Sequence, residues 1–137
     1  MNISDPFYIL SAARDTLDAH EIKARTETLV HQVRGQGYGA ALCEGRYGDV
    51  DEPSVVVVDE TPGTDKCLKI VMRLARVYQQ ESILAVDVNG AARLLFLDGS
   101  KPLGIGKFTC VSENEAKRAA AYTKRNGRYY ICVAVTS

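Results

Sequence analysis

Four consecutive valines, Val55–Val58, constrain the fold of this chain more than any other feature of the sequence. Branching at Cβ restricts the side-chain rotamers and favours extended backbone, so the run predicts a strand over 54–58. Successive side chains of a strand point to opposite faces of its sheet. Four valines in a row therefore predict a central strand that is covered by apolar groups on both faces.

Two segments with apolar residues at helical spacing flank this strand. The first follows Asp15 or Thr16, either of which is a suitable N-cap, and ends at Gly35 and Gly37. The second covers 65–79 behind Thr64, and its apolar face is wide enough to pack against a sheet. The sequence therefore predicts two main helices that cover the central strand.

Further segments have the composition of strands, and Asn89-Gly90 between two of them predicts a type I′ hairpin. Ser112 and Glu115 have the spacing of a capping box and predict a short, alanine-rich helix near the C-terminus. Asn126-Gly127 is expected to begin the last strand. The predicted strands are 7–12, 38–47, 54–58, 82–88, 92–97, 103–111 and 129–135. Residues 48–53 are expected to form a turn or a longer loop.

The order of these elements predicts the fold class. Strands alternate with helices at first and then follow one another, which is typical of an α/β (α+β) protein. We expect a mixed β-sheet of about six to seven strands, with two main helices and one short C-terminal helix. The 137 residues contain no internal repeat and no linker, so residues 1–137 are expected to form a single globular domain.

Charge and cysteine content limit the partners. The net charge is zero, although residues 1–98 have a balance of −5 and residues 99–137 a balance of +5. The four cysteines lack CxxC spacing and suit buried thiols in a reducing compartment. Since no secretion signal or membrane-length apolar run is present, a cytoplasmic location and no membrane association are expected.

Catalytic motifs are weak. His20 and His31 lie about 16 Å apart on the first predicted helix, too far for one metal ion. Gly104-x-Gly106 is too short for a phosphate loop and predicts a tight turn or bulge. Basic residues near Tyr122 and Tyr129 resemble a single-strand binding surface, but a basic edge with packed tyrosines is the favoured interpretation, so nucleic acid is not expected. No cofactor and no metal site are predicted.

Polar side chains gather near the ends of the predicted strands, where ligands commonly bind in α/β proteins. Arginine forks among them suit a phosphate or a carboxylate. An ion pair between Glu44 and Arg46 on the surface is the alternative interpretation. The candidate ligand-binding residues are Arg14, Arg25, Glu44, Arg46, Glu52, Ser54, Gln80 and Ser82.

Several segments carry a resemblance to a known family. They are the opening Phe7–Ala12, Gly37 before a strand that ends in Glu44-Gly45, Glu52–Ser54 before the valines, and Tyr78–Ser82 before an apolar strand. Over residues 7–97 the chain resembles small bacterial and phage proteins known only as domain of unknown function 3293. That family has no assigned activity, so the resemblance implies a fold and an origin, with no function.

These observations favour a protein without enzymatic activity that binds a small anionic or nucleotide-like ligand. For a phage protein, sequestering a nucleotide-derived host signal as a counter-defence would be a natural role. One alternative is an interaction module that inhibits a host enzyme, and a homo-oligomer is expected in either case. A third hypothesis is a metal-dependent phosphoesterase or nuclease, whose acids would be Glu44, Asp49, Asp51 and Glu52.

Overall fold

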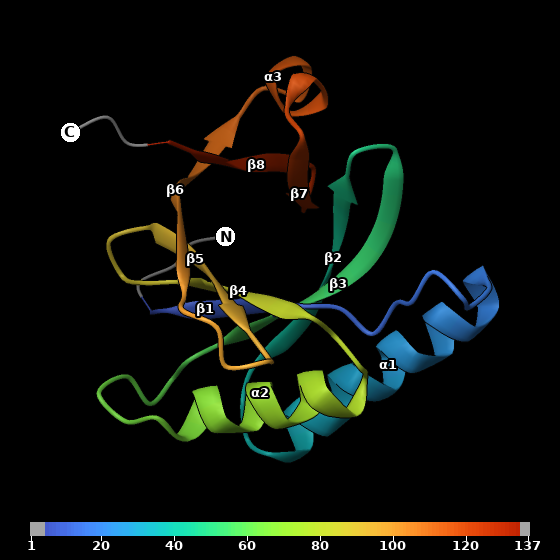
Figure 1. The fold of residues 1–137 in the computed structure, drawn as a ribbon, viewed down its shortest axis with the longest axis vertical. Coiled ribbons are helices and arrows are strands. Elements are labelled where there is room, and N and C mark those ends of the chain that lie inside the picture. The colour runs from blue at the N-terminus through green and yellow to red at the C-terminus, as the bar shows by residue number, and fades with distance from the viewer. Residues whose placement is uncertain (1–4, 135–137) are drawn as a thin grey trace.

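The computed structural model describes residues 5–134 and contains eight strands and three helices there (Figure 1). The strands are β1 (Phe7–Leu10), β2 (Ala40–Tyr47), β3 (Val50–Val58), β4 (Ser82–Val86), β5 (Ala91–Phe96), β6 (Leu103–Val111), β7 (Ala121–Arg125) and β8 (Arg128–Val133). The helices are α1 (Ala19–Gly35), α2 (Lys66–Val77) and α3 (Glu113–Arg118).

The strands form a closed barrel in the order β1-β3-β2-β7-β8-β6-β5-β4. All eight pairings are antiparallel, so the predicted mixed sheet of six to seven strands is wrong. The prediction failed because strand–helix alternation suggested that the connected strands would be parallel neighbours. In the barrel β3 lies between β1 and β2, which α1 connects, and β1 lies between β3 and β4, which α2 connects. β1 closes the barrel, since Ile9 pairs with Val56 of β3 and with Leu84 of β4.

The valine strand separates two apolar clusters. Val56 belongs to a cluster inside the barrel together with Phe7 and Ile9. Val55 and Val57 point the other way, into a cluster that the barrel wall shares with α1 and α2. Burial of this strand on both faces, as the sequence predicted, is therefore confirmed.

Both long helices cover one side of the barrel, while α3 lies at the far end beside β7 and β8 (Figure 1). α1 begins later than predicted, because the side chain of Asp18 accepts the N-cap hydrogen bond from Glu21. The N-cap of α2 is Asp65 in place of Thr64. The capping role of Ser112 in α3 is confirmed, since its Oγ accepts from the Glu115 amide at 3.2 Å.

The turn at Asn89-Gly90 departs from its predicted type. The hairpin at Asn89-Gly90 exists, but Gly90 alone has positive φ and the Asp87 carboxylate accepts from two amides of the loop. Positive φ at both central residues, the type I′ pattern, occurs at Asn126-Gly127. This turn joins β8 to β7, a strand that the sequence analysis missed. The predicted end of the last strand at Val135 lies outside the described residues.

The bulge expected at Gly104-x-Gly106 is confirmed by a register shift between β5 and β6. Gly106 has a φ of +107°, and a Cβ placed on it would lie 2.1 Å from the Val133 carbonyl oxygen. Of the two possibilities predicted for 48–53, a turn or a longer loop, the structure has a tight turn, and β3 already begins at Val50. Within residues 5–134, none of the helices is long and apolar enough to span a bilayer.

Candidate functional site

Three pockets border Pro53 on the paired strands β2 and β3, and together they are here named the Pro53 hollow, each pocket being one lobe. Pro53 lines all three lobes, and each pair of lobes shares a second residue. β1 pairs with β3 only from Val55 onward, so Pro53 has a strand partner on one side alone, a position where proline is tolerated. The three lobes differ in chemistry.

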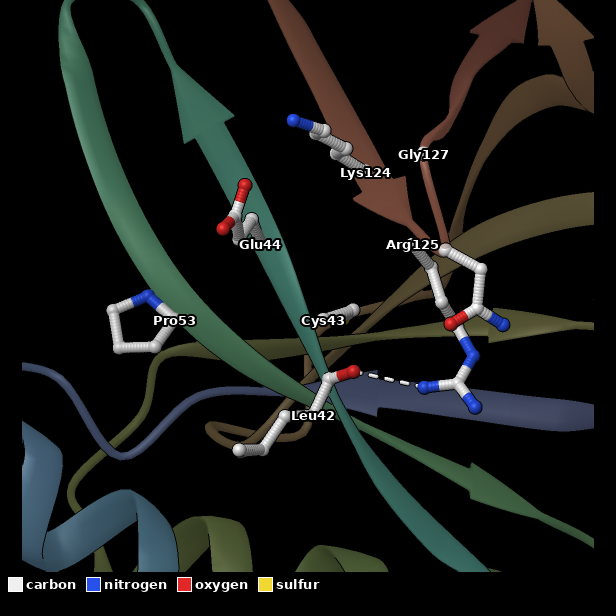
Figure 2. A pocket seen from close by; sticks show the side chains of 8 residues that line it. Leu42, Cys43, Glu44, Pro53, Lys124, Arg125 and Gly127 are labelled. Carbon is white, nitrogen blue, oxygen red and sulfur yellow. Dashed lines mark hydrogen bonds between the residues drawn. The ribbon is translucent and has the colours of Figure 1, made fainter.

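The basic lobe has a volume of about 390 Å³ and lies between β2, β3 and β7. Glu44 and Lys124 are direct cross-strand partners, and Figure 2 shows Glu44 between Pro53 and Lys124. Arg125 donates from Nη1 to the Leu42 carbonyl oxygen at 2.8 Å, the dashed line in Figure 2. This bond fixes the guanidinium at the lobe while leaving further N–H groups for an anion.

The acidic lobe, of about 340 Å³, is lined by carboxylates and one aromatic ring. Its charged residues are Glu44, Asp51 and Glu52, and Tyr122 of β7 forms the opposite wall. Tyr122 is held edge-to-face against Tyr129, with ring centroids 5.3 Å apart. Carboxylates and an aromatic face both attract cations, so this lobe suits a positively charged group.

The apolar lobe, of about 230 Å³, lies between β2, β3 and the first half of α1. Ile22 of α1 and Leu42 of β2 face it, and the exposed fraction of Leu42 is 54 %. Leu42 can be this exposed because it points away from the barrel interior on β2. An apolar surface of this kind suits a planar base or another uncharged group.

The Cys43 thiol borders the basic lobe but is not an activated nucleophile. Burial raises its pKa to about 12, and the nearby Arg125 only partly opposes this. A thiol with such a pKa stays protonated at neutral pH, and the protonated form is a poor nucleophile. The chemistry of the lobe therefore rests on its charged side chains.

Four of the eight predicted ligand residues lie on β2 and β3. Glu44 and Glu52 line the Pro53 hollow. Arg46 lies beside it, where Nε donates to the Gly48 carbonyl oxygen at 2.8 Å and the guanidinium approaches the Tyr122 ring. Ser54 is buried opposite Cys43. The suggested Glu44–Arg46 ion pair is not among the interactions of the described residues, and Arg46 pairs instead with Asp49 at 3.7 Å.

The other four lie where β1, α1 and α2 meet. Arg25 donates to the carbonyl oxygens of Ala12 and Tyr78, at 2.8 and 3.1 Å. Gln80 donates to the Ala13 and Tyr78 carbonyls, and Arg14 donates to that of Gln79. Ser82 begins β4 and is half-buried. The structure thus divides the predicted set into two groups on different elements.

A separate apolar hollow of about 460 Å³ opens at the end of the barrel near α3. Phe108 and Tyr130, stacked with centroids 5.1 Å apart, form part of its lining. No charged side chain lines it, so it suits uncharged groups only. Tyr122 lines both this hollow and the acidic lobe and forms a wall between them.

The acids of the proposed phosphoesterase do not form a metal centre. Across residues 5–134, no three His, Cys, Asp or Glu side chains gather closely enough to hold a metal ion. Asp49 is fully exposed at the turn, paired with Arg46. These four acids therefore give no support to a two-metal or one-metal hydrolysis mechanism.

Sequence reasoning missed the half of the hollow that β7 provides. From the sequence, the basic residues around Tyr122 are interpreted as a basic edge and no strand is predicted between the short helix and Asn126-Gly127, where the structure has β7 with Tyr122, Lys124 and Arg125. The Asn126-Gly127 dipeptide was the signal that could have revealed β7. Read as a hairpin turn, it requires a strand before it as well as after it.

Barrel and hollow together define a small β-barrel protein whose outer wall carries a basic, an acidic and an apolar lobe around Pro53. Comparison with protein families gives a more specific result. The model of the S-adenosylmethionine lyase family matches residues 8–133, so the chain belongs to that family. Among curated proteins no match is found.

This membership corrects the functional predictions. The resemblance to domain of unknown function 3293 is not confirmed, because the matching model is that of the lyase family. The prediction of a non-enzymatic sequestering protein is wrong, since the family is one of enzymes. Neither the host-enzyme inhibitor nor the metal-dependent phosphoesterase is supported. The expectation of a small nucleotide-derived ligand agrees with the family, whose name specifies S-adenosylmethionine.

Proposed function

We propose that this protein cleaves S-adenosylmethionine at a carbon–sulfur bond without adding water. The observation that carries the proposal is the family match, which extends over residues 8–133 and so includes every strand of the barrel from Tyr8 onward. A lyase breaks such a bond by elimination or by internal displacement, and neither route needs a metal or a redox cofactor.

The substrate itself supplies much of the driving force. When the bond between the sulfonium sulfur and Cγ of the methionine part breaks, its electron pair goes to sulfur, and neutral 5′-methylthioadenosine leaves. In the same step Cγ either bonds to the substrate's own carboxylate, which closes a lactone, or becomes part of an alkene while a carboxylate of the site takes the Cβ proton. Holding the substrate in a reactive conformation is the contribution expected from the protein.

The Pro53 hollow is the site we propose for this reaction. Its acidic, basic and apolar lobes match the sulfonium, the carboxylate and the adenine of the substrate. Glu44 borders both charged lobes, and Glu52 borders the acidic one. Both belong to the ligand-binding set predicted from the sequence, and we propose them as substrate contacts.

The test is to incubate the purified protein with S-adenosylmethionine and to separate the nucleosides by chromatography. We expect the substrate to disappear and 5′-methylthioadenosine to accumulate in equal amount. Glu44→Gln should lower kcat/KM at least about tenfold, by the loss of a charged hydrogen-bonding group. Glu81→Gln, an exposed change just before β4, is the matched control and should leave the rate unchanged. Absence of 5′-methylthioadenosine overturns the proposal.

The cytoplasm is the location we propose, because S-adenosylmethionine is made and used there. For a phage-encoded protein, destroying this methyl donor would deprive host methylation of its substrate, which fits the counter-defence role expected from the sequence. The expected homo-oligomer stays a prediction, and light scattering at several protein concentrations would test it.

A further inference from the structure

We infer that the Pro53 hollow holds S-adenosylmethionine in one orientation, with a different lobe for each part of the molecule. The methionine carboxylate lies at Lys124 and Arg125 in the basic lobe. The sulfonium lies in the acidic lobe, and the adenine lies against Ile22 and Leu42 in the apolar lobe. This inference rests on the proposed function and adds to it the residues that select each part of the substrate.

Charge fixes the position of the carboxylate. Lys124 and Arg125 border the basic lobe and neither borders the acidic lobe. Arg125 is already held by its bond to the Leu42 carbonyl, so little side-chain freedom is lost when its remaining N–H groups bind an anion. Lys124 stands over the Tyr129 ring, 5.4 Å from its centroid, which orients the ammonium.

The acidic lobe selects the cation. Asp51 and Glu52 border it without bordering the basic lobe, and Glu52 is half-buried between Gly45 and the turn. The ring of Tyr122 also lines this lobe, and the Arg46 guanidinium already lies 6.0 Å from its centroid. A neutral thioether gains no attraction from the carboxylates, so this lobe distinguishes substrate from product.

The shared centre at Pro53 makes the three assignments compatible. A sulfonium sulfur is a branch point that carries the adenosyl and the amino-acid parts, and the hollow also branches at one residue. Leu42 joins the apolar lobe to the basic lobe, and Asp51 joins the apolar lobe to the acidic lobe. The adenosyl part therefore reaches its lobe directly from the branch point.

The experiment measures competitive inhibition by three analogues, each lacking part of the substrate. S-adenosylhomocysteine lacks the positive charge, decarboxylated S-adenosylmethionine lacks the carboxylate, and 5′-methylthioadenosine lacks both. In Lys124→Met we expect the ratio of the inhibition constant of 5′-methylthioadenosine to that of S-adenosylhomocysteine to fall about tenfold. The same ratio taken with decarboxylated S-adenosylmethionine should not change. In Glu52→Gln the ratio of the inhibition constant of 5′-methylthioadenosine to that of decarboxylated S-adenosylmethionine should fall instead. The ratio taken with S-adenosylhomocysteine should not change.

Two controls separate orientation from general damage. Lys69→Met removes an exposed lysine of α2 that pairs with Asp65, outside the hollow, and should change no inhibition constant. Ile22→Ala should weaken all three analogues by a similar factor, because each contains adenine.

Equal losses for all three analogues in Lys124→Met or Glu52→Gln would overturn the orientation while leaving lyase activity, and so the proposed function, intact. If the wild-type protein neither cleaves S-adenosylmethionine nor binds any analogue in a calorimeter, the proposed function itself falls.

Discussion

At the scale of single residues, the two groups of predicted ligand residues have different surroundings. The guanidinium of Arg25 donates hydrogen bonds to two main-chain carbonyl oxygens, and its Cζ lies 5.1 Å from the centroid of the Tyr78 ring. Glu44 and Glu52 instead line a hollow. The sequence shows that such side chains lie near strand ends. It does not show which of them donate their hydrogen bonds to neighbouring main-chain carbonyls.

Replacing Arg25 by methionine tests this difference. We expect the free energy of unfolding to fall by about 2 kcal/mol, because the Ala12 carbonyl oxygen loses its arginine donor and the Tyr78 carbonyl oxygen keeps only Gln80. The KM for S-adenosylmethionine should stay unchanged. Urea denaturation and steady-state kinetics measure the two effects. A raised KM at unchanged stability would instead make Arg25 a ligand contact, as the sequence predicted.

Two buried cysteine thiols make the stability of the fold depend on pH in the alkaline range. Burial raises the pKa of Cys43 and of Cys67 from 9.0 to about 12, and Asp59 adds to the shift at Cys67. Because the folded state holds these protons more tightly, the stability they contribute is complete below pH 9 and is lost as pH rises toward 12.

We therefore expect the melting temperature to fall steadily between pH 9 and about pH 11. The double variant Cys43→Ala, Cys67→Ala has no thiol to titrate at these positions, so its melting temperature should fall less over the same range. An unchanged pH slope in the double variant would contradict this account. Differential scanning fluorimetry at fixed ionic strength is sufficient.

At the scale of elements, local sequence signals predicted well which helices and strands exist, and predicted poorly how the strands pair. The valine strand, the two long helices and the Ser112 cap are visible in the sequence because each depends on neighbouring residues. Strand β7 was missed because alanine runs favour helix, while pairing of Glu44 with Lys124 across the sheet decides the local structure. The candidate site needs this strand, so only its β2 and β3 half was predictable.

The β6 bulge gives a sharp test of one element. Gly106→Ala places a methyl group 2.1 Å from the Val133 carbonyl oxygen and forces alanine to a φ of +107°. We expect a loss of at least about 2 kcal/mol in the free energy of unfolding. Gly104→Ala is the matched control, since nothing lies within 4 Å of its new Cβ. Equal, small effects of both changes in urea denaturation would show that the bulge is not constrained.

At the scale of the whole molecule, closure of the barrel is the feature that sequence patterns do not contain. It depends on β1 pairing with both β3 and β4, contacts that join residues far apart in the chain. Closure also brings the basic C-terminal part of the chain against the acidic part that precedes it. Strand β7, from the basic C-terminal part, is placed against β2, from the acidic part, and the Pro53 hollow lies along that junction.

The measurement that tests the central claim most directly is the reaction of S-adenosylmethionine in water enriched in ¹⁸O, followed by mass spectrometry at early times. We predict 5′-methylthioadenosine together with an amino-acid product that lacks the elements of water and carries no ¹⁸O. Homoserine labelled with ¹⁸O from the first time point would show hydrolysis and contradict a lyase, and intact substrate would contradict the activity altogether.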